Sequence, residues 1–149
     1  MPLLEMPNVS FYSLQKINGL QELNELPLGL FHNFGDAFDN EHGRFMDTAA
    51  LMKTLDLVIS IDTSVVHLAG AMGVPVWAML PHASCWRWFY DESQSTLYPS
   101  MRLFRQPKFN DWESVVLAIK KQLEQLVTPK PIYNELQSND QLSLSLELN

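Results

Sequence analysis

The chain has very little cysteine and no long apolar run. Cys85 is the single cysteine among 149 residues, so no disulfide can form within the chain. No apolar stretch reaches the roughly 18–20 residues that a membrane-spanning helix needs. The first residues, MPLLEMPNVS, lack the basic start and the long apolar segment of a signal peptide. We therefore expect a cytoplasmic protein with no membrane span.

Positive charge is also scarce. The chain carries 10 Lys and Arg residues against 17 Asp and Glu, which gives a net charge of −7, and the basic residues form no cluster. Nucleic-acid binding depends on cations that meet phosphates, so we expect no nucleic-acid partner. An anionic small ligand would need local help from backbone amides, a helix N-terminus or individual arginines.

The motifs of several enzyme classes are missing. The sequence has no GxGxxG, no P-loop, no CxxC and no HExxH, which argues against pyridine-nucleotide oxidoreductases, P-loop NTPases and common zinc sites. The four histidines at 32, 42, 67 and 82 show no metal-ligand spacing. We expect neither a metal nor a cofactor.

Helical and strand patterns alternate through the middle of the chain. Continuous apolar, β-branched runs are typical of parallel strands covered on both faces, and Gly and Pro mark the end of a helix. These signals predict a helix that begins at Asp47, a strand at 57–61, a helix at 64–72, a strand at 76–80 and a helix from 110 or 111 to just before Pro129. The alternation predicts an α/β fold with a Rossmann-like parallel sheet.

Other segments give weaker signals. Residues 9–14 and 28–31 are short strand candidates, and residues 82–110 are expected to be mostly irregular. We expect one domain over residues 1–128, followed by an extended or disordered tail at 129–149. Within this tail, residues 142–148 alternate strictly between leucine and polar residues, and this pattern also fits a half-buried strand.

The segment Asp62-Thr63-Ser64 is the strongest candidate for a binding site. Ligands of parallel sheets bind beyond the carboxyl ends of the strands, and this segment joins such an end to the start of a helix. The helix dipole and free N–H groups there favour a phosphate or diphosphate, and His67 lies on the same side of the helix as Thr63. The alternative is structural, because Asp, Thr and Ser are also preferred helix caps and a helical histidine often packs in a core.

Arg87 is a second candidate, because it follows the next predicted strand and its planar guanidinium suits phosphate oxygens. Its alternative role is a surface ion pair with Asp91. The tryptophans beside it, Trp86 and Trp88, fit a core or an interface better than a stacking platform for a nucleobase.

A long ordered stretch resembles a known family. The sequence from Asp47 to Trp77, which contains DLVISIDTSVVHLAGAMGVPVW, is similar to the heptosyltransferase-like (family 9) glycosyltransferases, above all to bacterial versions that follow tetratricopeptide repeats. The upstream FYSLQ and the downstream WRW, YPSMRLFRQ and DW match the same group. The resemblance covers roughly residues 9–127.

This resemblance implies a GT-B fold, in which two Rossmann-like domains face each other and the C-terminal one binds a nucleotide-sugar donor. It implies that Asp62 contacts sugar hydroxyls, that Thr63 and Ser64 hold the diphosphate, and that His67 lines the same pocket. It further implies that Ser13 and Gln15 lie near the nucleoside. The implied partner is a nucleotide-diphosphate sugar, of the ADP or UDP type, bound without a metal.

The sequence also departs from this family. By comparison with it, the chain begins after the first strand of the C-terminal domain, and the N-terminal domain with the acceptor site and catalytic base is absent. We therefore assign no catalytic residue and expect the C-terminal half of a GT-B fold without its first strand. Residues 142–148, a second copy of the chain or a separate N-terminal domain would complete the structure.

The sequence thus supports a donor-binding domain or fragment of a glycosyltransferase that transfers a sugar to an acceptor hydroxyl. The alternative is a non-catalytic remnant that acts as a protein-interaction or dimerisation module. A third reading is another Rossmann-like binder of nucleotides or phosphosugars, such as an epimerase-like domain.

Overall fold

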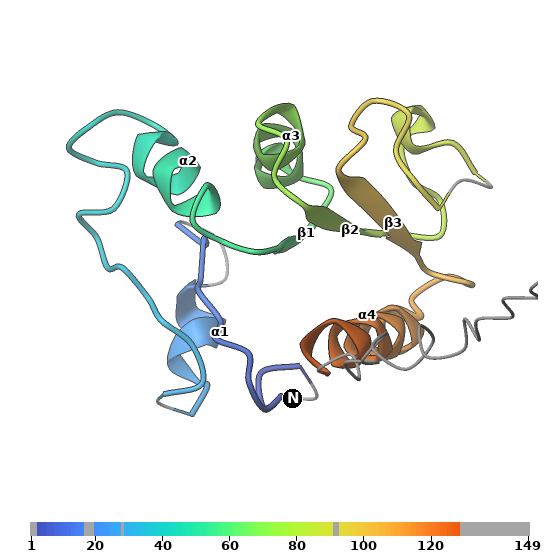
Figure 1. Cartoon of the computed structure of the whole chain (residues 1–149), viewed down its shortest axis with the longest axis horizontal. Helices are drawn as coiled ribbons and strands as arrows, with labels where there is room; N and C mark the ends of the chain where they lie inside the picture. Colours follow the sequence, from blue (N-terminus) through green and yellow to red (C-terminus); the bar gives the residue numbers. More distant parts are fainter. Residues whose placement is uncertain (1–2, 17–19, 28, 91–92, 129–149) are drawn as a thin grey trace, which may run out of the picture.

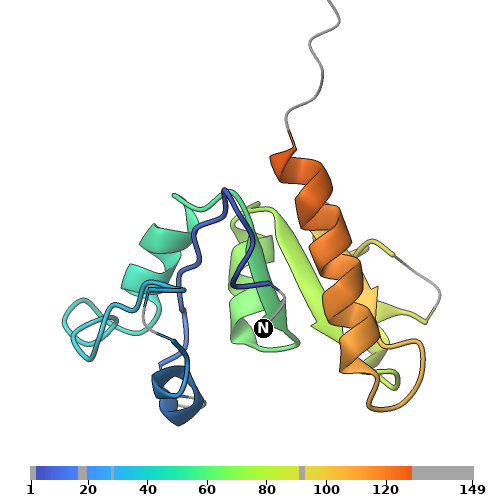
Figure 2. The same ribbon diagram turned by 90° about the horizontal axis from the view of Figure 1, so that it is seen from below.

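The computed structural model describes residues 3–16, 20–27, 29–90 and 93–128, and it has three layers (Figures 1 and 2). A parallel sheet forms the middle layer. Helices α2 (Met46–Met52) and α3 (Ser64–Ala71) lie over one face, while α4 (Trp112–Val127) covers the other. The short helix α1 (Leu20–Asn24) lies on the α4 side.

The sheet has the order β1-β2-β3, with all pairs parallel. Its strands are β1 (Val58–Ile61), β2 (Val76–Leu80) and β3 (Met101–Arg105). Val76 lies opposite Val58 on one side and Met101 on the other, so the three strands begin level with one another. Helix α3 connects β1 to β2, which makes the fold α/β and Rossmann-like, as predicted.

The larger part of the core lies between the sheet and the helices α2 and α3. Successive side chains of a strand point to opposite faces, so Val76, Ala78 and Leu80 of β2 all face this layer. They are joined by buried residues from both helices and from the loop after β2: Met52, Val66, Ala69 and Trp88. The central strand β2 is thus covered on this side along its whole length.

The second core layer lies under α4. Trp77 and Phe104 project from β2 and β3 with their ring centroids 5.2 Å apart. The helix covers them with its apolar stripe of Val115, Ile119 and Leu123. Asp111 caps this helix, because its Oδ1 accepts a hydrogen bond from the amide of Ser114 at 3.1 Å. None of the helices in the described part of the chain is long and apolar enough to cross a membrane.

Most predicted elements are confirmed, and the segment 82–110 is mostly irregular as predicted, but one strand within it was missed. The segment contains the 3₁₀ helix η1 (Trp86–Trp88) and the strand β3. The run MRLFR, which forms β3, was not recognised as a strand because Arg102 and Arg105 break its apolar pattern. Arg102 reaches Gln122 of α4 at 2.6 Å, and its guanidinium lies 5.2 Å from the ring centroid of Phe104.

The two weak strand candidates near the N-terminus were also wrong in part. The first contributes Tyr12 to a single parallel bridge with His32, one residue beyond the second candidate, and His32 N donates to Phe11 O at 2.7 Å and Ser13 N to His32 O at 2.9 Å. In the described part of the chain, β1 pairs with β2 alone. The segment 142–148 and the rest of the tail lie outside the described residues.

Candidate functional site

Four side chains meet beyond the carboxyl end of β1: Asp62, His67, Trp88 and Tyr98. We call them the Asp62 cluster. The indole Nε1 of Trp88 donates a hydrogen bond to Asp62 Oδ2 at 2.8 Å. The other carboxylate oxygen, Oδ1, lies 3.6 Å from His67 Nε2. The Asp62 carboxylate is therefore held from two sides while 22% of its side chain stays accessible.

His67 is held as firmly as its partner. Its Nδ1 lies 3.1 Å from the hydroxyl of Tyr98. Its ring stacks on Trp88 with centroids 5.2 Å apart and planes at 22°, and it meets the edge of Tyr98 at 5.8 Å. Because both ring nitrogens and one ring face have fixed neighbours, the imidazole has little freedom to rotate.

Gly70 allows this arrangement. It lies on α3, three residues after His67 and hence on the same face of the helix. A Cβ at position 70 would lie 2.6 Å from Cγ of Tyr98, closer than real Cβ atoms approach other carbons. The tyrosine ring can therefore pack directly against the helix backbone, which brings its hydroxyl to His67.

The start of α3 lies next to the cluster. It has the helix-capping role that the sequence analysis gave as the structural alternative to ligand binding. Thr63 is the N-cap, and its hydroxyl oxygen accepts a hydrogen bond from the amide of Val65 at 3.4 Å. It also lies 3.5 Å from the hydroxyl of Ser60. Thr63 and Ser64 are both exposed, so a cap is present here and the helix start faces solvent.

The cluster offers a carboxylate acceptor beside an imidazole nitrogen. Such a pair suits vicinal hydroxyl groups, because one group accepts a hydrogen bond while its neighbour donates or accepts another. It does not suit a metal as it stands. Within the described residues, no third His, Cys, Asp or Glu joins Asp62 and His67, and no group of three that could hold a metal occurs elsewhere.

Ser13 and Gln15 do not line the Asp62 cluster. They lie in a separate cavity of about 210 Å³, which we call the N-terminal cavity. Amide and aromatic side chains share its wall, and Phe34 stacks on Phe38 with centroids 4.9 Å apart. Its lining residues are Ser13, Gln15, Lys16, Asn33, Phe34, Gly35, Asp36, Phe38 and Asn40.

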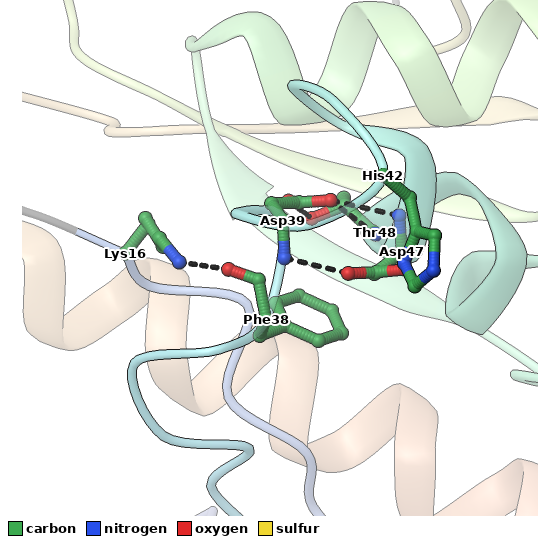
Figure 3. A network of polar contacts seen from close by, with 6 residues as sticks. All are labelled: Lys16, Phe38, Asp39, His42, Asp47 and Thr48. Carbon is green, nitrogen blue, oxygen red and sulfur yellow. Dashed lines mark hydrogen bonds and ion pairs between the residues drawn. The ribbon is translucent and has the colours of Figure 1, made fainter.

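A network of polar contacts, shown in Figure 3, fixes the loop of this cavity to the start of α2. Asp39 Oδ1 accepts from the amides of Asp47 (2.8 Å) and Thr48 (3.0 Å), and its Oδ2 accepts from the Thr48 hydroxyl. Asp47 Oδ2 accepts in return from the amide of Asp39 at 2.7 Å, and His42 Nδ1 lies 3.3 Å from Asp47 Oδ1. Lys16 donates to the carbonyl of Phe38. We call the contacts of Asp39 with Asp47 and Thr48 the Asp39 clasp.

The helix that was predicted to begin at Asp47 begins one residue earlier, and Asp47 does not cap it. Helix α2 begins at Met46 after Phe45, which has a left-handed backbone (φ 65) and makes no side-chain cap. The free amides of the first turn are instead bonded by Asp39, eight residues upstream of Asp47. Such a distant cap has no short-range signature in the sequence.

The clasp lowers the pKa of Asp39. Partial burial alone raises this pKa, but the hydrogen bonds from Thr48 and from the amide of Asp47 outweigh it, with a smaller effect from Lys16. A carboxyl whose pKa is lower in the folded state adds stability above its unfolded pKa of about 3.9, and this stability is lost as the pH falls through the folded value.

We expect Asp39→Asn to lower the free energy of unfolding by about 1 kcal/mol at pH 7, because hydrogen bonds to a neutral amide are weaker than those to a carboxylate. Asparagine also tolerates the positive φ of 59 at this position. Urea unfolding from pH 7 to pH 3 should show the difference shrinking below about pH 4. The matched control is Asp36→Asn, an exposed side chain in the same loop. A pH-independent difference would contradict this account.

Arg87 lies in η1, between Trp86 and Trp88. Its Nε is buried without a hydrogen-bond partner among the described residues, and its alternative partner Asp91 lies outside them. Trp86, the first residue of η1, lines a second cavity of about 360 Å³, which we call the aromatic cavity. Its lining residues are His82, Ala83, Ser84, Cys85, Trp86, Phe89, Tyr90, Arg105 and Phe109.

The structure thus brings Asp62 and His67 together at the exposed start of α3, with Thr63 and Ser64 beside them. It places Ser13 and Gln15 in another cavity, and Arg87 within η1. Sequence reasoning missed two members of the site, Trp88 and Tyr98. Trp88 was assigned to a core or an interface, and it is indeed wholly buried, but its indole N–H also fixes Asp62.

Comparisons with known proteins give one informative match. No protein-family profile matches the chain, and no solved structure matches it. The chain is similar to Protein FlbA of Caulobacter vibrioides, with 33% identity over 116 residues. The matched region covers 75% of this chain and 19% of FlbA, so the chain spans about a fifth of the length of this curated relative.

Proposed function

We propose that this domain binds the nucleotide-diphosphate sugar donor of a glycosyltransferase. The observation that carries the proposal is the Asp62 cluster, in which a partly accessible carboxylate and an imidazole are fixed beside the start of α3. This is the place where ligands of parallel α/β sheets bind. The resemblance to family 9 glycosyltransferases supports the same assignment of these positions.

We assign the roles of the residues from the resemblance, and the geometry is compatible with them as follows. One oxygen of Asp62 is engaged by Trp88, so Oδ1 is the atom that accepts from a sugar hydroxyl, with His67 Nε2 beside it. The diphosphate lies at the exposed start of α3, where the dipole and the first amides favour an anion, near Thr63 and Ser64. The nucleoside extends towards the amides and rings of the N-terminal cavity, where Ser13 and Gln15 lie. Arg87 lies in η1 beside Trp88, its Nε is buried without a hydrogen-bond partner among the described residues, and its part in donor binding stays a prediction.

Sugar transfer also requires a general base within reach of the acceptor hydroxyl. We propose that another domain or chain supplies this base together with the acceptor site. The domain described here then contributes donor binding alone.

Calorimetric titration tests the proposal, with ADP, UDP and GDP and then with their sugar conjugates. We expect saturable binding of one nucleotide series. Asp62→Asn should weaken binding of the sugar conjugate at least about tenfold, or 1.4 kcal/mol, and should change the affinity of the free nucleotide much less. The reason is that the amide keeps the shape but loses the charged acceptor for the sugar. Asp56→Asn is the matched control, since Asp56 is exposed at the other end of β1.

Two results would argue against the proposal: no binding at millimolar ligand by a folded protein, or equal effects of Asp62→Asn on sugar conjugate and free nucleotide. The alternative hypothesis, a non-catalytic protein-interaction module, would then be preferred over donor binding. It has an observation of its own, because Trp86, Phe89 and Tyr90 are 78%, 53% and 65% exposed. Sedimentation equilibrium would test whether this surface joins two copies of the chain.

A further inference from the structure

We propose that the aromatic cavity is a second binding site, for an organic anion that joins an apolar ring to a carboxylate or phosphate group. The cavity lies beyond the ends of β2 and β3, and none of its lining residues belongs to the Asp62 cluster. The inference stands on the cavity itself and does not depend on the nucleotide-sugar proposal.

The first argument is a fixed cation. The guanidinium of Arg105 donates to the hydroxyl of Ser84 and to the backbone carbonyls of Trp88 (3.0 Å) and Phe89. These contacts hold the group in one orientation, but they bring no negative charge to it from the described residues. Among the described residues no carboxylate lies within ion-pair distance of Arg105, and its Nε is buried without a partner. A bound anion would balance this charge, and the planar guanidinium suits carboxylate and phosphate.

The second argument is the wall of the cavity. Four large aromatic side chains surround it and remain open to solvent: Trp86 (78% exposed), Phe89 (53%), Tyr90 (65%) and Phe109 (72%). The Arg105 guanidinium lies 5.7 Å from the Tyr90 ring centroid, so the cation and one ring share a side of the cavity. Exposed rings gathered around one hollow suit a ligand with an apolar face.

The third argument is His82, which supplies an oriented polar group. Its backbone amide donates to Gln106 Oε1 at 3.1 Å, and its Nδ1 lies 3.2 Å from the Gln106 carbonyl oxygen. A carbonyl oxygen only accepts, so Nδ1 carries the proton, and this hydrogen bond fixes the orientation of the ring on the cavity wall. Phe109 meets this ring edge-on at 4.8 Å and keeps it in place.

Together these features select a ligand with two parts. A cavity of about 360 Å³ has room for one ring with an acidic group. Inorganic phosphate would leave the aromatic walls uncovered, and an uncharged ring would leave Arg105 unbalanced. We therefore expect both halves to be needed for tight binding.

The test uses the full 149-residue chain with phenyl phosphate as the probe, followed by calorimetry and by the fluorescence of the tryptophans. Phenyl phosphate should bind saturably, and both inorganic phosphate and benzyl alcohol should bind at least about tenfold more weakly. Benzoate in place of phenyl phosphate shows which acidic group the site prefers.

Matched variants locate the site. Arg105→Lys keeps the charge but loses the planar fork, and it should weaken phenyl phosphate at least about tenfold. Arg102→Lys on the same strand, outside the cavity, should have no effect. If Arg105→Lys fails to fold, Trp86→Ala provides the test, because its ring is largely exposed and its loss should weaken binding without unfolding the protein. Trp112→Ala, at the start of α4, is the control for that variant.

Several results would overturn the inference. Benzyl alcohol that binds as tightly as phenyl phosphate would mean a simple apolar patch. If phenyl phosphate binds only after the double substitution Asp91→Asn and Glu92→Gln, a carboxylate of the chain itself already neutralises the charge of Arg105. Displacement of phenyl phosphate by a nucleotide would mean that the cavity belongs to the donor site. Failure of nucleotide binding alone, with phenyl phosphate still bound, would count against the donor proposal only.

Discussion

Replacing Trp88 with alanine should lower the free energy of unfolding by about 3–5 kcal/mol, the range for a large aromatic residue removed from a core. Trp88 is 0% exposed and packs among the buried side chains between the sheet and α3. Its loss leaves a cavity there and removes the stacking partner of His67. Urea unfolding at pH 7 measures the change.

Two further variants separate packing from hydrogen bonding at this position. Trp88→Phe keeps an aromatic ring but loses the indole N–H that bonds Asp62, and we expect a smaller loss of about 1.5–3 kcal/mol, as for a hydrogen bond to a charged group. Trp86→Ala, two residues earlier and 78% exposed, should change stability by less than about 0.5 kcal/mol. A loss for Trp88→Ala as small as that for Trp86→Ala would mean that η1 is not part of the core.

Gly70→Ala should destabilise the protein by about 1–3 kcal/mol, although alanine is ordinarily better than glycine inside a helix by about 0.5–1 kcal/mol. The added Cβ would lie 2.6 Å and 2.9 Å from two ring carbons of Tyr98 and 3.0 Å from Met101 Cε. The tyrosine ring must move away, and its hydroxyl then leaves His67. Thermal and urea unfolding measure the loss.

The same substitution in a Tyr98→Ala background is the control. With the ring removed, the alanine at 70 has space, and the loss should largely disappear because the two positions are coupled through one contact. Ala71→Gly on the exposed side of α3 should cost about 1 kcal/mol through helix propensity alone. A Gly70→Ala protein more stable than the original would show that Tyr98 does not pack against this helix.

The elements that sequence reasoning found are those specified by neighbouring residues. The strand at 76–80 is an unbroken apolar run, and the strand at 58–61 is apolar except for Ser60. Helix α3 has Thr63 as a cap and ends just before Gly73, whose φ is +69. These local signals also placed Asp62 at the carboxyl end of a strand and His67 on the adjoining helix. The α/β class therefore followed from the sequence.

The remaining features depend on residues far apart in the chain. Trp88 and Tyr98 are 26 and 31 residues from the side chains that they bond, so no local pattern could pair them. The same holds for Arg105, which interrupts an apolar strand and bonds Ser84, 21 residues away. Such contacts become predictable only once the order of the strands is known.

The N-terminal segment affects how this sheet can meet other chains. Leu3 and Val9 pack against the core under α4, whereas Leu14 packs against the core under α3, so the segment passes from one layer to the other on the β1 side of the sheet (Figure 1). An open strand edge can recruit a foreign strand and start aggregation. Because this segment is anchored in both cores on the β1 side, we expect a foreign strand that pairs with the four-residue edge of β1 to disturb that packing, which adds a cost to self-association through this edge.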